Sequence, residues 1–553
     1  MTKRKNFGVL LIVGCVALAW PLASFAETLP VFELLAPQVK QARAQATAIL
    51  TDMSGGMLPE KAQVTERGNA IVHRAGSNEV EIQKASGGIF ARDTEQLWNR
   101  KLKPTLPSQA QARQIADQFL ARNRLLPQGN AWVQADFAGY GDSGVIFMTE
   151  TGQEKIILNQ QVNYDVGITI AGQRLPVVGG GGNFKVFVGD GGAVIGYHGV
   201  WRPLRRVVAH EEILPQEEAE AQFREQMGEL NLTRVESLLA YYSASSLEGQ
   251  TYVAPVWVVM AEAEIDGNPV PLRNTIVAAT DYGPQPPHQN PTGTRTLDDL
   301  PLSSLYDDEG SGVPWKDDGE NPPEAGAEWI GPSQGLWGSE ANAQGFLDSL
   351  GAAGWNNSFD WGEEWCWESD FVRNDDIWVD AVDWVFYTGH ASKEGWVANE
   401  PDDDFVDHEE LGGGGFGDGR YGSNDLEWLT IAACGPHQDD ALNGGGNVFA
   451  RWRGILDGLH VHMGYAAVTY DNTVEGGMVA DLALAGNSVI NAWLDTCVAV
   501  QPSTNGYPAP NGPNIYGTAL YQCNAGDDHI WGAGTTVADE PAPSCRAFTW
   551  TQC

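Results

Sequence analysis

The sequence predicts two folded regions, an α+β region in the N-terminal half and an α/β region with a mostly parallel sheet in the C-terminal half. After residue 328, uniformly apolar strand-like runs alternate with helical patterns, which is typical of a parallel sheet covered on both faces. Before residue 283, a helical pattern followed by a hairpin pattern occurs twice. The length of 553 residues also favours more than one domain.

Residues 1–26 are predicted to be an export signal. Lys3, Arg4 and Lys5 form a positive start, Phe7 to Trp20 form an apolar stretch, and small residues precede a cleavage position after Ala26. We therefore expect a periplasmic or extracellular protein. The mature chain has no further run long and apolar enough to predict a membrane span.

A second interpretation of the same segment is a lipoprotein signal. The run Ile12-Val13-Gly14-Cys15 resembles a lipoprotein box, which would make Cys15 a lipidated N-terminus. This alternative leaves a very short apolar region before the cysteine, so signal-peptidase cleavage after Ala26 is favoured.

Residues 27–283 are predicted to form two helix-plus-hairpin repeats. One helix begins near Ser108, a favourable N-cap, and the second begins near Pro215. The hairpins pair Phe184–Val188 with Ala193–Tyr197, and Val256–Ile265 with Val270–Ala278. This pattern resembles the pepsin-SY-like and thermolysin-propeptide-like modules that precede secreted peptidases, and the resemblance implies an inhibitory or chaperoning pro-region. The alternative is a plain α+β packing domain.

Residues 284–327 are rich in Pro, Gly and Asp and are predicted to be an exposed linker or a maturation-cleavage region. The charge of the chain changes at the same point. Its formal net charge is −39, and from Pro284 onward there are 8 basic and 43 acidic residues. This acidic half disfavours nucleic acid and anionic membranes as partners and favours cations or basic peptides, although simple solubility also explains such charges.

Residues 328–553 carry the α/β pattern and end in a loop-rich tail. The predicted strands are Val382–Tyr387, Trp428–Ala432 and Val461–Tyr470, and the predicted helices are Ala341–Leu350, Asn447–Leu459 and Met478–Cys497. Ligand sites form at the carboxyl ends of the strands in open parallel sheets. The residues that follow the predicted strands are therefore the first candidates for function.

Two strand ends carry residues that can do chemistry. The first strand leads into Gly389-His390, and the second leads into Cys434-Gly435. A cysteine and a histidine at neighbouring strand ends can form a nucleophile and its proton-transfer partner. Glycine beside each residue allows close approach of a substrate and leaves backbone N–H groups to face a developing oxyanion.

The pattern of an apolar strand ending in Gly-His and a second ending in Cys resembles the caspase-like group that includes gingipains, clostripain and separase. Residues of roughly 328–540 resemble an uncharacterised bacterial domain family within this group. The resemblance implies a three-layer α/β sandwich, His390 as general acid/base, Cys434 as nucleophile, and backbone amides near Gly389 as oxyanion donors. Ala391 departs from the group pattern, which has glycine after the histidine.

Other polar residues give weaker signals. Asp402, Asp404 and Asp407 lie in an acidic loop that could bind calcium or select a basic substrate, the alternative being a solvated loop. Asp471 and Asn472 follow the third strand and are the best candidates for polar groups in a substrate pocket. No cofactor is required by the proposed chemistry.

Several remaining motifs are more readily structural. His460 and His462 share one face of a strand and could hold zinc only with a third ligand. Gly412–Gly415 lacks the strand and helix context of a phosphate loop. Cys523, Cys545 and Cys553 lie close together in an exported chain, so a disulfide within this set is plausible. Cys366 lies among tryptophans, where a buried thiol is expected.

The sequence supports three hypotheses of function. The first is a secreted caspase-like cysteine endopeptidase with an inhibitory N-terminal region, which could cleave after basic residues. The second is a catalytically inactive caspase-fold protein that binds peptides or glycans. The third is a calcium-stabilised structural protein. An open cleft shared by His390 and the Cys434 sulfur would favour the first, and a buried or disulfide-bonded sulfur would favour the second.

Overall fold

The computed structural model describes residues 28–56, 62–284, 322–399, 404–412, 419–505, 513–540 and 543–553. The predicted signal segment 1–26 and most of the predicted linker lie outside these residues. Within the described part of the chain, no helix is long and apolar enough to span a membrane.

In the described part of the N-terminal half there are three helices, each followed by antiparallel strands. The helices are α1 (Val39–Met53), α2 (Gln109–Asn123) and α3 (Gln216–Gln226). The strands before α2 are β1 (Thr28–Leu34), β2 (Gln63–Arg67), β3 (Ala70–Ala75), β4 (Asn78–Gln83) and β5 (Ile89–Asp93). Those between α2 and α3 are β6 (Val133–Thr149), β7 (Gly152–Ile170), β8 (Gln173–Val178), β9 (Asn183–Val188), β10 (Val194–Val200) and β11 (Leu204–Glu212). After α3 come β12 (Asn231–Tyr242), β13 (Tyr252–Val253), β14 (Pro255–Ile265), β15 (Asn268–Pro271) and β16 (Thr275–Ala278).

The two predicted helix-plus-hairpin repeats correspond to α2 with β9 and β10 and to α3 with β14 and its partners. The α2 helix begins as expected, since the Ser108 side chain accepts from Gln111 N–H and completes a capping box. A third unit, α1 with β2 to β5, was not predicted. The strand predicted at Val270–Ala278 is interrupted between β15 and β16, but both segments pair antiparallel with β14, so Leu272, Arg273 and Asn274 form an irregular stretch within it.

The C-terminal half alternates strands and helices. Its strands are β17 (Glu324–Trp329), β18 (Asn356–Gly362), β19 (Trp384–Thr388), β20 (Gly395–Val397), β21 (Phe405–Asp407), β22 (Trp428–Ala432), β23 (Val461–Tyr465), β24 (Tyr516–Gln522) and β25 (Cys545–Gln552). Its helices are α4 (Ser339–Ala352), α5 (Ser369–Val372), α6 (Val448–Trp452), α7 (Glu475–Leu484) and α8 (Val489–Val500). Since β17 begins at Glu324, the predicted linker 284–327 extends too far.

The sheet is mixed, so the expectation of a mostly parallel sheet was wrong. Parallel pairing joins β18, β17, β19, β22 and β23 in that order. Antiparallel pairing then continues through β24 and β25 into β6 of the N-terminal half. Most pairings beyond β6 are also antiparallel. The architecture is therefore α/β with one large mixed sheet to which both halves of the sequence contribute.

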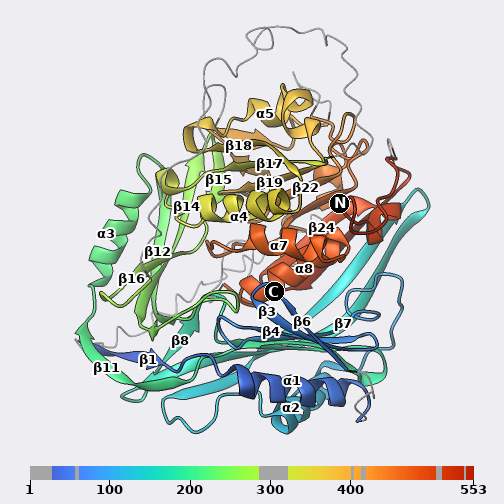
Figure 1. Cartoon of the computed structure of the whole chain (residues 1–553). Coiled ribbons are helices and arrows are strands. Elements are labelled where there is room, and N and C mark those ends of the chain that lie inside the picture. The colour runs from blue at the N-terminus through green and yellow to red at the C-terminus, as the bar shows by residue number, and fades with distance from the viewer. Residues whose placement is uncertain are drawn as a thin grey trace, which may run out of the picture.

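The parallel strands are covered on both faces. On β19, Trp384 and Phe386 pack with helices α4, α7 and α8, whereas Val385 and Tyr387 pack with α5 and α6 on the other side. This alternation follows from the two-residue period of a strand. Figure 1 shows α4, α7 and α8 on the face turned toward the N-terminal half, and α5 on the opposite face.

Helix α8 lies between the two halves and is buried on nearly all sides, as expected for a helix that is apolar all round. The buried Lys185 of β9 donates to the backbone carbonyls of Val498 and Gln501 at the end of α8, at 2.5 and 2.9 Å. Arg92 of β5 forms an ion pair with Asp495 of α8. The N-terminal half therefore supplies the hydrogen-bond and ion-pair partners of buried polar groups on α8.

Two predicted helices differ from those observed. The pattern Met478–Cys497 forms α7 and α8 instead of one helix, with a break that contains Gly486 at φ +89°. Only Val448–Trp452 of the predicted Asn447–Leu459 helix is helical. Among the tail cysteines, Cys523 and Cys545 form a disulfide with Cα atoms 5.5 Å apart.

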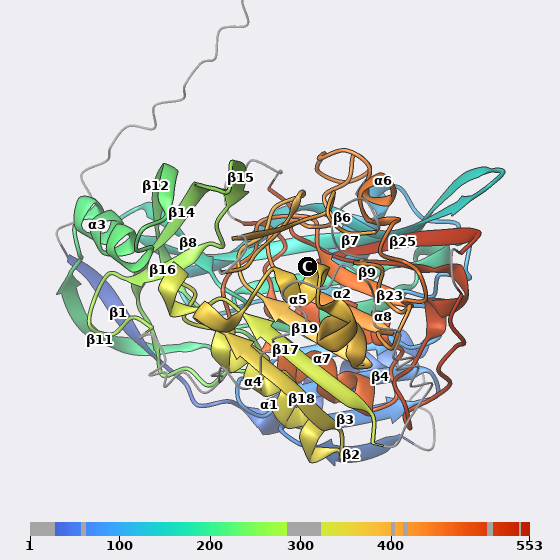
Figure 2. The ribbon, with the colours of Figure 1, turned by 90° about the horizontal axis from the view of Figure 1, so that it is seen from above.

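Strand β25 joins the halves, and Figure 2 shows it beside β6 and β7. Its Phe548 is fully buried and lies opposite Leu520 of β24 and Ile146 of β6. We predict that Phe548→Ala lowers the free energy of unfolding by about 3–5 kcal/mol, because it leaves a cavity at this junction. Urea unfolding followed by fluorescence measures this.

The matched control is Val64→Ala on β2, where the side chain is 51% exposed and the expected change is within about 0.5 kcal/mol. A loss of stability at Phe548 no larger than that of the control would contradict the joint core.

Candidate active site

His390 lies two residues beyond β19, and its side chain is fully buried. Its Nδ1 accepts a hydrogen bond from the backbone N–H of Arg273 at 3.2 Å. Its Nε2 lies 3.0 Å from the carbonyl oxygen of Gln334 and must therefore carry the proton. Burial lowers the pKa of His390 to about 4, with the nearby Arg273 charge acting in the same direction and the Gln334 carbonyl opposing it. The imidazole is therefore neutral.

Cys434 lies two residues beyond β22, and its thiol is also fully buried. The sulfur accepts from the backbone N–H of Thr469 at 3.3 Å and lies 3.7 Å from Thr469 Oγ1. Burial raises the pKa of the thiol above its ordinary value, although the positive charge of Arg273 acts in the opposite direction. The resting form is therefore the thiol and not the thiolate.

A buried strip that consists of Arg273 and Thr469 connects the two residues. Strands β19 and β22 are parallel neighbours, with Thr388 opposite Ala432 at their ends. Arg273 contacts His390 through its backbone, and its Nε donates to Thr469 Oγ1 at 3.1 Å. Since Thr469 also contacts the Cys434 sulfur, His390 and Cys434 are linked through Arg273 and Thr469, and their catalytic roles stay a prediction.

Arg273 comes from the N-terminal half, in the irregular strand segment between β15 and β16, and its exposed fraction is 0%. Its Nη1 donates to Thr388 Oγ1 at 3.1 Å, and its Nη2 pairs with Glu475 Oε2 at 3.4 Å. This residue was not predicted from the sequence. Its position as a single arginine inside an apolar strand pattern could have identified it, because a buried charge requires a partner.

Glu475 was also missed, because the predicted helix began at Met478 and not at Glu475. It lies in the first turn of α7 and is fully buried. Its Oε1 accepts from the Tyr465 hydroxyl and from Gln501 Nε2, both at 2.7 Å. These bonds fix the carboxylate, so that its second oxygen faces Arg273.

Of the two predicted pocket residues, Asp471 lies close to Arg273 and Asn472 is structural. Asp471 accepts from Gly338 N–H at 2.7 Å, and burial raises its pKa to about 6 although Arg273 opposes the shift. Asn472 Oδ1 accepts from the N–H groups of Val474 and Glu475 at the start of α7. Both residues line a cavity of about 390 Å³ together with Asn274, Thr275, Trp337 and Gln501.

The residues beside the pair are tightly packed. A Cβ at Gly389 would lie 2.1 Å from the Tyr387 hydroxyl, and Gly435 adopts φ +75°, so both positions favour glycine. Ala391 is fully buried and forms a bridge with Trp396. The oxyanion role of the backbone at Gly389 and Gly435 stays a prediction.

Two of the three predicted calcium ligands, Asp404 and Asp407, lie within the described residues. Asp402 lies outside them, and Asp404 comes just before β21. Asp407 pairs with His408 at 3.0 Å, and this contact helps to lower the pKa of Asp407 against the effect of burial.

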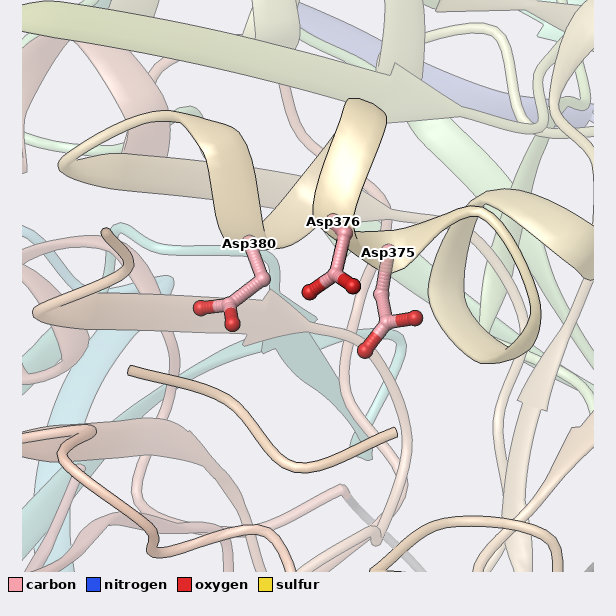
Figure 3. Close-up of side chains that lie close together, drawn as sticks. All are labelled: Asp375, Asp376 and Asp380. Atoms are coloured by element: carbon pink, nitrogen blue, oxygen red, sulfur yellow. The ribbon is translucent and has the colours of Figure 1, made fainter. Parts of the chain in front are cut away.

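Two other carboxylate groups do come together in the described structure. One is Asp375, Asp376 and Asp380, whose side chains point the same way in Figure 3. The other, with all three side chains buried, is Asp383, Asp425 and Glu427. In each group one oxygen of every residue lies within 4.8 Å of the others, a spacing that a divalent cation could fill. Calcium binding stays a prediction.

The predicted histidine pair is divided between two sets of partners. His460 Nδ1 lies 2.8 Å from Asp528, and its Nε2 lies 3.2 Å from Asp539. His462 Nδ1 lies 3.0 Å from Nε2 of His437. The structural interpretation of both histidines is therefore favoured over a shared zinc site. Of the candidate Gly412–Gly415 motif, only Gly412 lies within the described residues.

The C-terminal half is similar to a family of unknown function. A family model described as a domain of unknown function (DUF6345) matches residues 327–552. No curated protein matches the chain. Among solved structures, an uncharacterized protein from Eubacterium rectale ATCC 33656 is similar over 47% of this chain and 86% of its own, with 9% identity and a TM-score of 0.29. Neither description names an activity, and a structural likeness this weak supports no argument about function.

The buried histidine makes a prediction for acid stability. Because the pKa of His390 is about 4 in the folded chain and 6.5 is its ordinary value, the unfolded chain binds this proton first as pH falls. The stabilising effect is complete above pH 6.5 and is lost as pH falls to 4. We predict that wild type loses about 3 kcal/mol more than His390→Asn over this range.

Urea unfolding at pH 7, 5.5 and 4 measures this difference. The exposed His210 provides the control, because His210→Asn should keep the wild-type pH dependence. Equal acid sensitivity of His390→Asn and wild type would show that His390 is not buried in neutral form.

Proposed function

We propose that this chain is an exported cysteine endopeptidase of caspase-like architecture that cleaves peptide bonds through Cys434 and His390. The observation that carries the proposal is the position of these two residues, which follow adjacent parallel strands and contact the same Arg273–Thr469 strip. Parallel strands covered by helices on both faces are compatible with the three-layer sandwich that the sequence resemblance implies.

The proposed reaction uses the Cys434 sulfur and His390 Nδ1, which both face the Arg273–Thr469 strip. The Cys434 sulfur attacks the carbonyl carbon of the peptide bond, and the thiol proton passes to His390 Nδ1. The same nitrogen then protonates the leaving amine, and water hydrolyses the thioester. Gln334 supports this role because its carbonyl holds the Nε2 proton and so leaves Nδ1 as the acceptor. The backbone amides near Gly389 and Gly435 would stabilise the oxyanion.

The described conformation is a latent one. Both reacting groups are buried, the thiol is protonated, and Nδ1 of His390 is occupied by the Arg273 N–H. A substrate cannot approach unless the segment between β15 and β16 that carries Arg273 moves. This supports the proposal that residues 27–283 inhibit the C-terminal half. Because β6 and β25 pair in one sheet, cutting the chain at 284–327 would not by itself separate the halves.

The complete burial of the sulfur favours a second candidate function. A caspase-fold protein without activity would bind peptides or glycans and would keep Cys434 as a packing residue. In that case Arg273 would be a permanent part of the core. Substrates, export and calcium dependence belong to the same set of proposals and need direct tests.

Hydrolysis of a peptide library, analysed by mass spectrometry, tests the proposal. We predict that the mature chain with Arg273→Ala, which removes the side-chain contacts that hold the covering segment in place, cleaves peptides, and that adding Cys434→Ala or His390→Ala lowers the rate by at least about 100-fold. The matched control is Cys366→Ala, because Cys366 is also a buried cysteine but packs in the core on the α5 side of the sheet. Absence of cleavage in every variant would favour the binding protein.

A further inference from the structure

The amino ends of strands β19 and β22 carry buried acidic side chains. Asp383 directly precedes β19, Glu427 directly precedes β22, and Asp425 lies two residues before Glu427. Because the two strands are parallel and their first residues lie opposite each other, their amino ends meet at one edge of the sheet. The candidate catalytic pair follows the carboxyl ends of the same strands, so these acidic residues lie at the opposite sheet edge.

Main-chain hydrogen bonds hold the two strand starts together. The N–H groups of Glu427 and Trp428 both donate to the carbonyl oxygen of Asp383, at 3.1 and 3.0 Å. Asp383, Asp425 and Glu427 are only 4%, 7% and 5% exposed, and one carboxylate oxygen of each lies within 4.8 Å of the other two. The fold therefore gathers three carboxylates in a space with almost no solvent.

The side chain of Glu427 has no hydrogen bond to offset its burial. Its Oε2 is buried and has no hydrogen-bond partner among the described residues. Burial raises the pKa of Glu427 well above its ordinary value, and the charges of Asp383, Asp425, Asp539 and Asp528 act in the same direction. A buried carboxylate in such surroundings requires neutralisation, either by a proton or by a cation.

His460, which precedes the neighbouring strand β23, directs its charge to other carboxylates. Its Nδ1 lies 2.8 Å from Asp528, and its Nε2 lies 3.2 Å from Asp539. Burial alone would lower the pKa of His460, but these two hydrogen bonds raise it to about 9. The imidazole is therefore protonated at neutral pH, with both nitrogens bound to groups other than Glu427.

The chemistry and spacing of the three carboxylates match calcium. Ca²⁺ prefers oxygen ligands, with bonds of about 2.3–2.6 Å. Oxygens up to 4.8 Å apart fit one such ion, because two ligands on opposite sides of an ion are separated by twice the bond length. Mg²⁺ requires shorter bonds of about 2.0–2.1 Å and usually keeps several water molecules, so it fits a nearly dry group of three carboxylates less well.

Asp383 connects this edge to two other parts of the chain. Its Oδ2 accepts from the N–H of Glu324 at the start of β17, at 2.5 Å. Its Oδ1 accepts from the indole N–H of Trp531 in the C-terminal tail. An ion bound to Asp383 would therefore tie the start of β17 and the tail to the amino ends of β19 and β22.

We propose that Asp383, Asp425 and Glu427 bind one calcium ion, which stabilises the amino edge of the parallel strands and the tail that packs on it. The site is separate from the acidic loop that contains Asp404 and Asp407. Its role is structural, and it does not rest on the proposed peptidase function.

Calorimetric titration with calcium chloride tests the site, using the full mature chain stripped of metal with EDTA and dialysed at pH 7. We expect calcium to bind, and to raise the melting temperature by at least about 3 °C when present at about 100 times its Kd. Magnesium chloride should bind at least about tenfold more weakly. Absence of calcium binding by the folded, stripped chain would overturn the proposal, and equal binding of magnesium would overturn the assignment to calcium.

The variant Glu427→Gln keeps the shape of the side chain and removes its charge. It should weaken calcium binding by at least about tenfold, because a charged ligand is lost. Its metal-free melting temperature should be no lower than that of wild type, since the variant removes a buried charge that has no partner. Unchanged calcium affinity in the folded variant would contradict the proposed site.

The matched control is Asp376→Asn, because Asp376 belongs to the second group of three carboxylates with the same spacing. Asp407→Asn makes the same comparison for the acidic loop. Both variants should keep the calcium affinity and the melting-temperature shift of wild type. Loss of binding in either control, with wild-type binding in Glu427→Gln, would place the calcium elsewhere and overturn the proposal.

Asp425→Asn covers the case in which Glu427→Gln does not fold. This variant also removes one charged ligand, so we expect it to bind calcium at least about tenfold more weakly than wild type. Wild-type affinity in folded Asp425→Asn would overturn the site of three carboxylates.

Discussion

The structure depends on the buried ion pair between Arg273 and Glu475. It joins the strand segment between β15 and β16 of the N-terminal half to the first turn of α7, and it lies beside both His390 and Cys434. A pair of charges without solvent is stable only if each partner is present and additional hydrogen bonds satisfy the remaining groups. Thr388, Thr469, Tyr465 and Gln501 provide those bonds, so the ion pair and the site form one network.

The sheet explains how the ion pair is held in place. Strand β25 pairs with β6, and Lys185 and Arg92 of the N-terminal half bind the carbonyls and carboxylate of α8. These contacts make the N-terminal half part of the scaffold on which the site is built. The movement that would open the site is then smaller than separation of two domains: it is displacement of the irregular strand segment between β15 and β16.

Local sequence patterns predicted much of the fold but not its connections. The strand Trp428–Ala432 and the α2 helix with its Ser108 cap were predicted correctly, because alternation of apolar residues and capping depend on neighbours in the chain. The pairing of β25 with β6 was not, since it joins residues about 400 positions apart. The antiparallel pairing of β24 with β23 and with β25 turned the expected parallel sheet into a mixed one.

In the candidate site, too, residues set by local patterns could be predicted and residues brought in by long-range contacts could not. His390 and Cys434 could be predicted because each ends an apolar strand, but Arg273 and Glu475 become visible only when the two halves are packed together. Calcium binding by the loop carboxylates Asp402, Asp404 and Asp407 stays a prediction, because Asp402 lies outside the described residues.

Closure of the site by Arg273 is tested most directly by the rate at which iodoacetamide alkylates Cys434 in the mature chain, mapped by mass spectrometry. We expect slow alkylation in wild type and alkylation at least about tenfold faster in Arg273→Ala. The alkylation rate should fall again when His390→Ala is added to Arg273→Ala. The wild-type rate should be unchanged in Arg202→Ala, which removes another buried arginine of the N-terminal half. Equal rates in wild type and Arg273→Ala would contradict the claim that Arg273 closes the site.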